Sequence, residues 1–408
     1  MKNTQDTLLG FVLNLFVSLP EPRRRHCRVY PLEMLLFCAM ATFITGRKSF
    51  YDMNAFAEVY KDLLIELFGV SSTPSHDTFA RIFRILDKKL FALCLQKFSE
   101  KIGDIMARHV VAIDGKTCRR ARDAARKAAH IISAWSPGEK LTPGVCMVGE
   151  KSNEIPAVPE LLDLLGATLK GTVVTAGAFN TQKATAAAII AKGADYVLAV
   201  KDKQPELSKA VSFFLDHFAD TAAPMWSSTE KGHGRLEVRS CWQSEDVKWI
   251  PTFKEWKGLK SICVVQRTST KLTTGETTTS RRYFISSLPL GPQEIARCVR
   301  EHWDVENSCH WSLDVIFNED CCLARAGNEA ANLRTLRSIV MNYLTDAGKR
   351  LGSTDTRMRM MTKAGMSTKY LYSVLGYNPT EVWVLQFFWG KLGLPRPAVP
   401  LHPLWVSP

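Results

Sequence analysis

The chain has 408 residues, of which 46% are hydrophobic and 23% are charged, as is ordinary for a soluble globular protein of two or three domains. Its 53 Lys and Arg residues outnumber 40 Asp and Glu residues, which gives a formal net charge of +13 and makes a polyanion the first partner to expect. Eleven cysteines, odd in number and without a CxxC pair, argue against a disulfide framework, so we expect reduced thiols.

Neither a membrane span nor a secretion signal is expected. The longest apolar stretch near the start, residues 34–45, is shorter than the roughly 20 residues that a spanning helix needs, so it predicts a buried helix. The first residues lack the charged, apolar and small-residue regions of a signal peptide in succession. The sequence therefore predicts a cytoplasmic protein with no membrane partner.

Residues 1–100 carry apolar side chains at helical spacing, which predicts a helical N-terminal domain that could bind DNA. Ser75 or Asp77 could cap a helix that follows, and the alternative is a turn that contacts DNA. The cluster Arg23, Arg24 and Arg25 could follow the phosphates of a DNA backbone, or could be an exposed loop.

From residue 101 the pattern changes to short β-type runs alternating with helical runs, which predicts an α/β fold with a mixed sheet. Residues 101–224 form the first part of this core, 225–290 a β-rich insertion, and 291–376 the helical remainder. The tail 377–408 is atypical, with six prolines and three tryptophans. The expected strands are 109–113, 145–148, 172–175 and 196–200, and the expected helices are 158–165 and 181–192.

Asp114 follows an apolar strand and precedes Gly115, whose missing side chain lets another group approach closely. Such an aspartate could hold a metal ion, although many aspartates in this position only cap a turn. The basic residues after it suit a phosphate backbone, or form a solvated face: Lys116, Arg119, Arg120, Arg122, Arg126 and Lys127.

A second polar segment lies at residues 300–314. A spacing of four would align His302, Glu306, His310 and Asp314 on one ridge of an α-helix, as a metal or phosphate site or as satisfied polar groups of a buried helix. The histidines and the nearby Cys309, Cys321 and Cys322 fit no standard zinc spacing, so a zinc hydrolase is only a third hypothesis.

Several motifs in order resemble the H-repeat-associated (ISAs-type) family of insertion-sequence transposases, a branch of the DDE group. The matching segments are 74–79, 112–117, 151–165 (KSNEIPAVPELLDLL), 193–200 (GADYVLAV), 231–239 (KGHGRLEVR) and 302–320, within a resemblance that extends from about 22 to 376. It implies a ribonuclease H-like core in which two aspartates and a glutamate bind two Mg²⁺ (or Mn²⁺) ions. It also implies double-stranded DNA with inverted-repeat ends as the partner. A homo-oligomer is left open.

By this resemblance Asp114 is the first aspartate and Glu306 is the glutamate, both as catalytic residues and metal ligands. The second aspartate is missing, because Gly177 stands in its place after the strand. The neighbouring Thr175 and Asn180 offer only neutral oxygens. We therefore expect a transposase with impaired strand cleavage and transfer, and the alternative is a catalytically dead DNA-binding protein derived from one.

Within 231–239, two glycines around His233 would let the backbone approach a phosphate or base, and Arg235 could add charge. The alternative is a hairpin held by an Arg–Glu pair. The complete set of predicted DNA-binding residues is Arg23, Arg24, Arg25, Lys116, Arg119, Arg120, His233 and Arg235.

Overall fold

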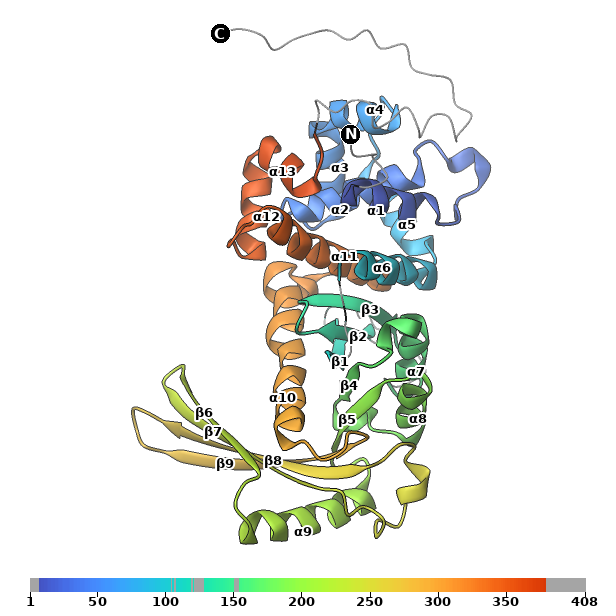
Figure 1. Cartoon of the computed structure of the whole chain (residues 1–408). Helices are drawn as coiled ribbons and strands as arrows, with labels where there is room; N and C mark the ends of the chain where they lie inside the picture. Colours follow the sequence, from blue (N-terminus) through green and yellow to red (C-terminus); the bar gives the residue numbers. More distant parts are fainter. Residues whose placement is uncertain are drawn as a thin grey trace. The chain divides into compact units, whose positions relative to one another are not determined.

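The computed structural model describes residues 7–103, 105, 108–118, 120, 128–149 and 154–378. The chain forms two compact units (Figure 1). The helical unit comprises Met1–Ile85 and Ala347–Pro408, and the sheet unit comprises Leu86–Asp346. The sequence analysis placed residues up to 376 in the core, whereas here the chain from Ala347 groups with the N-terminal helices. Most of the tail, 379–408, lies outside the described residues.

The helical unit is built around α2 (Leu32–Ile44), in which every side chain except Glu33 is buried. Ser49 starts α3 with a capping box, in which its hydroxyl accepts from the Asp52 amide. The Ser75 hydroxyl, directly before α5, hydrogen-bonds with Thr78 Oγ1 (3.2 Å). The other helices of this unit are α1 (Leu8–Val17), α3 (Phe50–Val59), α4 (Lys61–Phe68), α5 (His76–Ile85), α12 (Arg357–Met366) and α13 (Thr368–Leu375).

One stretch, Arg25–Ile44, is long and apolar enough to cross a membrane by length and composition alone. In this structure 67% of it is buried. The central helix of a soluble protein passes the same test, so this stretch is weak evidence for a membrane span.

The sheet unit is a mixed α/β structure around one nine-stranded sheet, in the order β3-β2-β1-β4-β5-β9-β8-β7-β6. The parallel strands β1, β4 and β5 lie at its centre, β2 is antiparallel to β1, and β3 is antiparallel to β2. The predicted strands at 109–113, 145–148, 172–175 and 196–200 correspond to β1 (Val110–Thr117), β3 (Leu141–Met147), β4 (Val173–Ala176) and β5 (Asp195–Val200). The sequence analysis did not predict β2 (His130–Ser136).

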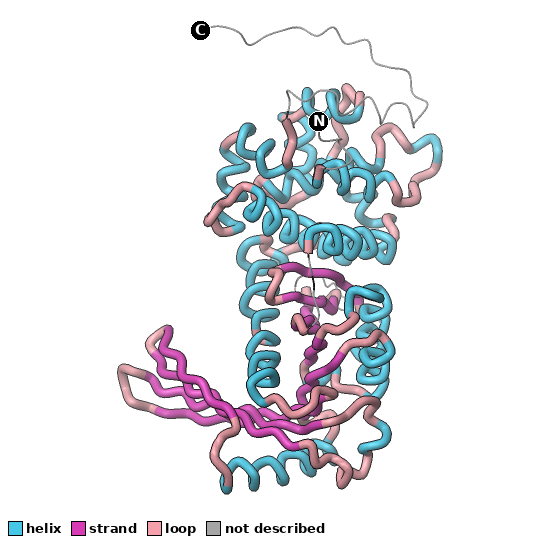
Figure 2. The backbone as a smooth tube through the Cα atoms, viewed as in Figure 1, coloured by secondary structure: helices cyan, strands magenta, loops and turns pink. Residues whose placement is uncertain are grey.

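Helices cover both faces of the central strands (Figures 1 and 2). Successive side chains of β1 point to opposite faces of the sheet. On one face Val111 and Ile113 pack in a cluster with α7 (Glu154–Leu165) and α8 (Lys183–Ala191). Val110 packs with Ile295 of α10 (Pro292–His302) on the opposite face. This alternation is the usual period of a strand buried on both sides. Further helices of this unit are α6 (Lys88–Ile102), α9 (Pro205–Thr221) and α11 (Glu329–Arg350), which continues past Asp346.

The β-rich stretch extends the same sheet. Its strands β6 (Trp226–Gly232), β7 (Arg235–Ser244), β8 (Ser261–Lys271) and β9 (Thr277–Ser286) form antiparallel pairs, and β9 pairs with β5. Their far ends extend beyond the central strands as a ribbon (Figure 2). A groove between this ribbon and α10 therefore belongs to the same unit as the central strands.

Candidate active site

The strand register brings Asp114 and Gly177 to the same edge of the sheet. Ile113 of β1 pairs with Ala176 of the parallel strand β4, so Asp114 and Gly177 are the next residues on neighbouring strands. The backbone of Gly177 is extended (φ −66°, ψ 163°), and among the described residues other than its two chain neighbours none has an atom within 4 Å of the place where a Cβ would stand. Position 177 therefore has both the space and the backbone conformation for an aspartate.

Glu306 follows α10 in a segment that is π-helical rather than α-helical, Val305–His310, and a second π-helical segment, Ser312–Ile316, follows. The predicted spacing of four residues per ridge therefore does not hold. Wider helices of this kind occur often at functional sites, because they redirect side chains. Glu306 itself is exposed.

The other polar residues of this segment contact the two central strands. His302 Nδ1 lies 2.9 Å from Thr175 Oγ1 on β4, and His310 Nδ1 lies 3.6 Å from Asp114 Oδ2 on β1. The two imidazoles thus have different partners. Burial lowers the pKa of His302 to about 4 and that of His310, which also lies near Arg334, to about 3. Both rings are neutral near pH 7.

Asp114 lies in a strongly acidic environment. Burial is the main cause that raises its pKa to about 7; the negative charges of Glu154 and Glu306 also raise it, whereas the Gly115 amide and His130 lower it. Although Glu306 lies 192 residues further along the chain (306 minus 114), its charge reaches Asp114. The negative charge of Glu306 thus acts in the same direction as burial on the pKa of Asp114.

Glu154, the first residue of α7, is a site residue that the sequence analysis missed. A Cβ at Gly115 would lie 2.5 Å from Glu154 Oε1, so the carboxylate rests against the glycine next to Asp114. His130 Nε2 lies 2.5 Å from Glu154 Oε1, and Asn180 Nδ2 donates to Oε2 (2.6 Å). Burial opposes ionisation, but these two hydrogen bonds lower the pKa of Glu154 overall. Only its place in the KSNEI motif could have pointed to it.

Lys116, predicted to bind DNA, has a different environment. Its side chain is only 8% exposed, and Nζ lies 2.7 Å from Asp314 and 2.9 Å from Asp320. The buried Glu319 is 3.8 Å away. Because these carboxylates already neutralise the ammonium group, we withdraw Lys116 from the DNA-binding set. It ties β1 to the chain that follows Glu306.

The described residues contain no ready-made metal cluster of three or more His, Cys, Asp or Glu side chains. The donors nevertheless suit a divalent cation. Glu154 and Glu306 each disfavour the ionised form of Asp114, and bound positive charge would relieve that repulsion. The Asn180 side chain is 2% exposed, and its Oδ1 has no hydrogen-bond partner. This buried carbonyl oxygen is a further hard donor.

A basic groove of about 890 Å³ lies between α10 and the ribbon of β6–β9. The hairpin turn at its margin places His233 (φ 48°) and Gly234 (φ 71°) in the left-handed region, as a two-residue turn of this kind requires. The groove's charged residues are Lys231, Arg235, Arg239, Arg267, Arg282, Arg300, Glu230 and Glu237. Six cations against two carboxylates leave an excess of four positive charges, which suits a polyanion.

The basic groove reaches the candidate catalytic residues. Asn307, next to Glu306, lines it, and the Arg282 guanidinium lies over the Trp303 ring, 4.1 Å from its centroid. Burial and the nearby Arg267 lower the pKa of Arg282, whereas Glu306 raises it. The positively charged groove therefore extends to the residue next to Glu306.

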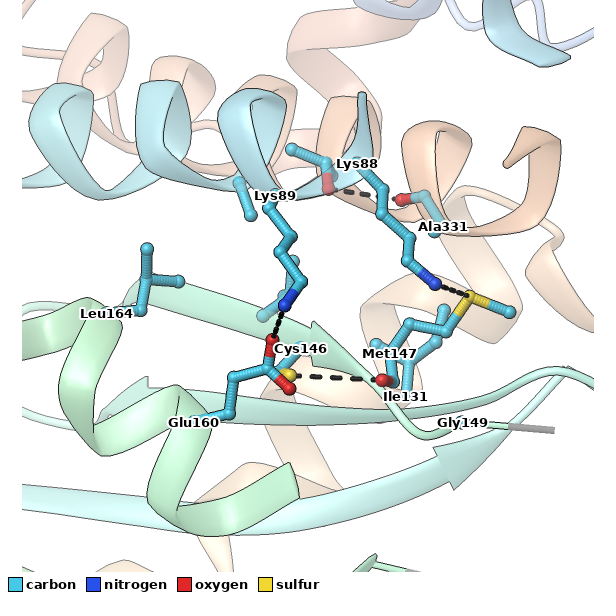
Figure 3. A pocket seen from close by; sticks show the side chains of 12 residues that line it. Lys88, Lys89, Ile131, Cys146, Met147, Gly149, Glu160, Leu164 and Ala331 are labelled. Atoms are coloured by element: carbon cyan, nitrogen blue, oxygen red, sulfur yellow. Dashed lines mark hydrogen bonds and ion pairs between the residues drawn. The ribbon is translucent and has the colours of Figure 1, made fainter. Parts of the chain in front are cut away.

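A second pocket, of about 360 Å³, lies between α6, α7, α11 and β3 (Figure 3). Lys89 Nζ is 2.6 Å from Glu160 Oε1, and Lys88 Nζ is 3.6 Å from the sulfur of Met147. None of the candidate catalytic residues lines this pocket. Lys89 and Glu160 are therefore useful control positions for substitutions in the same unit.

Comparisons with known proteins identify the family. Residues 84–343 match the family described as "Transposase DDE domain", and residues 13–99 match "DDE_Tnp_1-associated". The chain belongs to the H-repeat-associated DDE transposases. It is 36% identical over 372 residues to "H repeat-associated putative transposase YhhI" and to "Putative protein YbfL", both of Escherichia coli K12, covering 88% of this chain and 95% of each relative. "Putative transposase YncI" of Escherichia coli O157:H7 is 32% identical, covering 89% and 94%.

The remaining predicted DNA contacts of this DDE transposase chain fall in different places. His233 and Arg235 line the basic groove. In the helical unit Arg23 is bound to Glu21 (2.6 Å), whereas Arg24 and Arg25 are exposed. Arg120 is exposed, and Arg119 lies outside the described residues. Residues 231–239 also form the hairpin that was considered as the alternative, and Arg239 is bound there to Glu230 (2.8 Å).

Proposed function

We propose that this chain is a DNA transposase of the DDE type, built to cleave and join the ends of an insertion sequence at Asp114 and Glu306, and impaired because Gly177 replaces the second aspartate. One observation carries the proposal: Asp114 of β1 and the open position at Gly177 directly follow the last residue pair of the parallel strands β1 and β4, and Glu306 contributes to the raised pKa of Asp114. The substrate is double-stranded DNA with inverted-repeat ends, and the site of action is the cytoplasm.

The order of the central strands supports a ribonuclease H-like core. Three antiparallel strands, β3-β2-β1, are followed by the parallel β4 and β5, and helices cover both faces. In this arrangement a side chain just after β4 and one on β1 meet at one sheet edge. Glu306 arrives from the helical segment on the same side as His310.

Mg²⁺ or Mn²⁺ would be held by Asp114 and Glu306, and it would activate the attacking oxygen and stabilise the leaving oxygen of the phosphodiester. The chain itself orients the groups around that centre. The neutral His310 packs against Asp114 without competing for a proton near pH 7, and His302 fixes Thr175 at the end of β4. The basic groove holds the DNA phosphates beside Glu306.

The deciding experiment is strand cleavage of DNA that carries the element's own ends, recognised as inverted repeats flanking the gene. With Mg²⁺ or Mn²⁺ we expect slow cleavage by the unsubstituted chain, lost in Asp114→Asn and in Glu306→Gln. Cleavage that survives both substitutions would refute the assignment of the two carboxylates.

Gly177 itself favours the second candidate, a DNA-binding protein that recognises the ends without cutting them and competes with an active transposase. The basic groove does not depend on position 177. Tight, salt-sensitive binding to the ends, combined with no cleavage in either metal, is the outcome that selects this alternative. Whether the bound form is a homo-oligomer would be read from its mass on DNA.

A further inference from the structure

We propose that Glu154 is the third carboxylate of this active site and that Asn180 adds a neutral oxygen beside it. The inference rests on the proposed function. It assigns two residues outside the expected Asp-Asp-Glu set, and it explains how a chain with Gly177 could retain a working cation site.

The first argument is the position of the Glu154 carboxylate. Its Oε1 lies 2.5 Å from the point where a Cβ at Gly115 would stand, so only a glycine beside Asp114 leaves room for it. β1 continues past the end of β4, from Ile113 to Thr117, and Glu154 lies against this extension. Thus α7 brings a carboxylate to the edge at which Gly177 lacks one.

The second argument is how Glu154 is held. Each oxygen accepts one hydrogen bond, Oε1 from His130 and Oε2 from Asn180. An ionised carboxylate has about four acceptor positions, so each oxygen keeps one for a further ligand. His130 is itself fixed by Thr117 Oγ1, 2.7 Å from its Nδ1. Groups that hold a ligand in this way are typical of the outer shell of metal sites.

The third argument is independent of the acidic cluster. The Asn180 amide lies against Glu154, and although its side chain is 2% exposed, its Oδ1 has no hydrogen-bond partner. A buried carbonyl oxygen without a partner has lost its hydrogen bonds to water and gained none, so such groups are uncommon in folded proteins. A hard cation bound by Glu154 and Asn180 would satisfy it. Asn180 lies three residues after Gly177, in the turn that follows β4.

The test measures Mn²⁺ binding by the full-length protein, by calorimetry and by the electron paramagnetic resonance of free Mn²⁺, so it does not depend on catalysis. We expect Glu154→Gln to weaken binding at least about tenfold, and Asn180→Ala to weaken it less. Glu160→Gln, the same change on the same helix at the Lys89 ion pair, is the matched control and should bind as the unsubstituted chain does. Glu154→Asp, which keeps the charge, should retain more affinity than Glu154→Gln.

Failure of this inference can be distinguished from failure of the proposed function. If Asp114→Asn and Glu306→Gln lose Mn²⁺ but Glu154→Gln does not, the inference is wrong and the proposed function stands. Suppose that the unsubstituted chain does not bind Mn²⁺, whereas Gly177→Asp binds it and still binds it when combined with Glu154→Gln. The inference is then again wrong, because the family's own three carboxylates suffice. If neither the unsubstituted chain nor Gly177→Asp binds Mn²⁺, both fail. The melting temperature in EDTA shows whether each variant is folded.

Discussion

Gly177 stands beside Asp114 at the end of the neighbouring parallel strand, and the space that a side chain would occupy there is empty. Position 177 is neither crowded nor held in a left-handed conformation. An aspartate at position 177, as the proposed function requires, would therefore fit at this end of β4.

We predict that Gly177→Asp raises the rate of strand cleavage by about 100-fold or more, because electrostatic stabilisation of the transition state is worth several kcal/mol. Cleavage of end-bearing DNA with Mn²⁺ measures the effect. Gly138→Asp, at an exposed turn that also has free space, is the control and should not change the rate. Equal rates for the two variants would mean that the activity was lost elsewhere.

The basic groove predicts which arginine matters for DNA affinity. Arg235→Gln should weaken binding to the ends and reduce the slope of log K against log salt by about 1, since one phosphate contact is lost. Lys183→Gln removes the same charge from an ion pair with Glu255 and should change the slope much less. Fluorescence anisotropy between low and moderate salt measures both. Identical slopes for the two variants would argue against the groove.

Lys116 should affect folding more than DNA binding. Lys116→Met removes the buried ammonium group that lies against Asp314, Asp320 and Glu319, so we expect a loss of about 3–5 kcal/mol in the free energy of unfolding. Lys89→Met breaks an exposed ion pair and should cost much less. Urea denaturation gives both values. A stable Lys116→Met variant with a reduced salt slope would restore Lys116 to the DNA-binding set.

The sequence predicted the central strands because their apolar runs are local signals. Residues 172–175 and 196–200, for example, correspond closely to β4 and β5. The strand β2 was not predicted, since its apolar residues become part of a sheet only by pairing with β1 and β3. Long-range pairing of this kind leaves little trace in a short window of sequence.

The site was predictable where a motif carried it and not where distant residues meet. Family resemblance located Asp114, Glu306 and the gap at Gly177. The sequence could not show that Lys116 is neutralised by Asp314, because the two are 198 residues apart (314 minus 116). It also predicted α-helical spacing for the Glu306 segment, since no local residue pattern specifies a π-helix.

The last prediction uses the raised pKa of Asp114. In the metal-free folded protein this carboxyl keeps its proton up to about pH 7, whereas in the unfolded chain it ionises near 3.8. The folded state therefore binds more protons across this window, and its stability falls as pH rises from about 4 to 7. Asp114→Asn removes the titration, so in EDTA its advantage in the free energy of unfolding should grow from near zero at pH 4 to about 1–3 kcal/mol at pH 8.

Asp163→Asn, at an exposed carboxylate on α7, is the control and should show no such trend. Denaturant titrations from pH 4 to pH 8 provide the measurement, and an advantage of Asp114→Asn that did not vary with pH would contradict the acidic environment described for Asp114. Added Mn²⁺ should reverse the order at pH 8, because a ligand that binds only the folded state stabilises it and Asp114→Asn has lost a donor. A cation site at Asp114 requires that this carboxylate destabilise the folded protein without metal. It also requires that the same carboxylate stabilise the folded protein when the metal is bound.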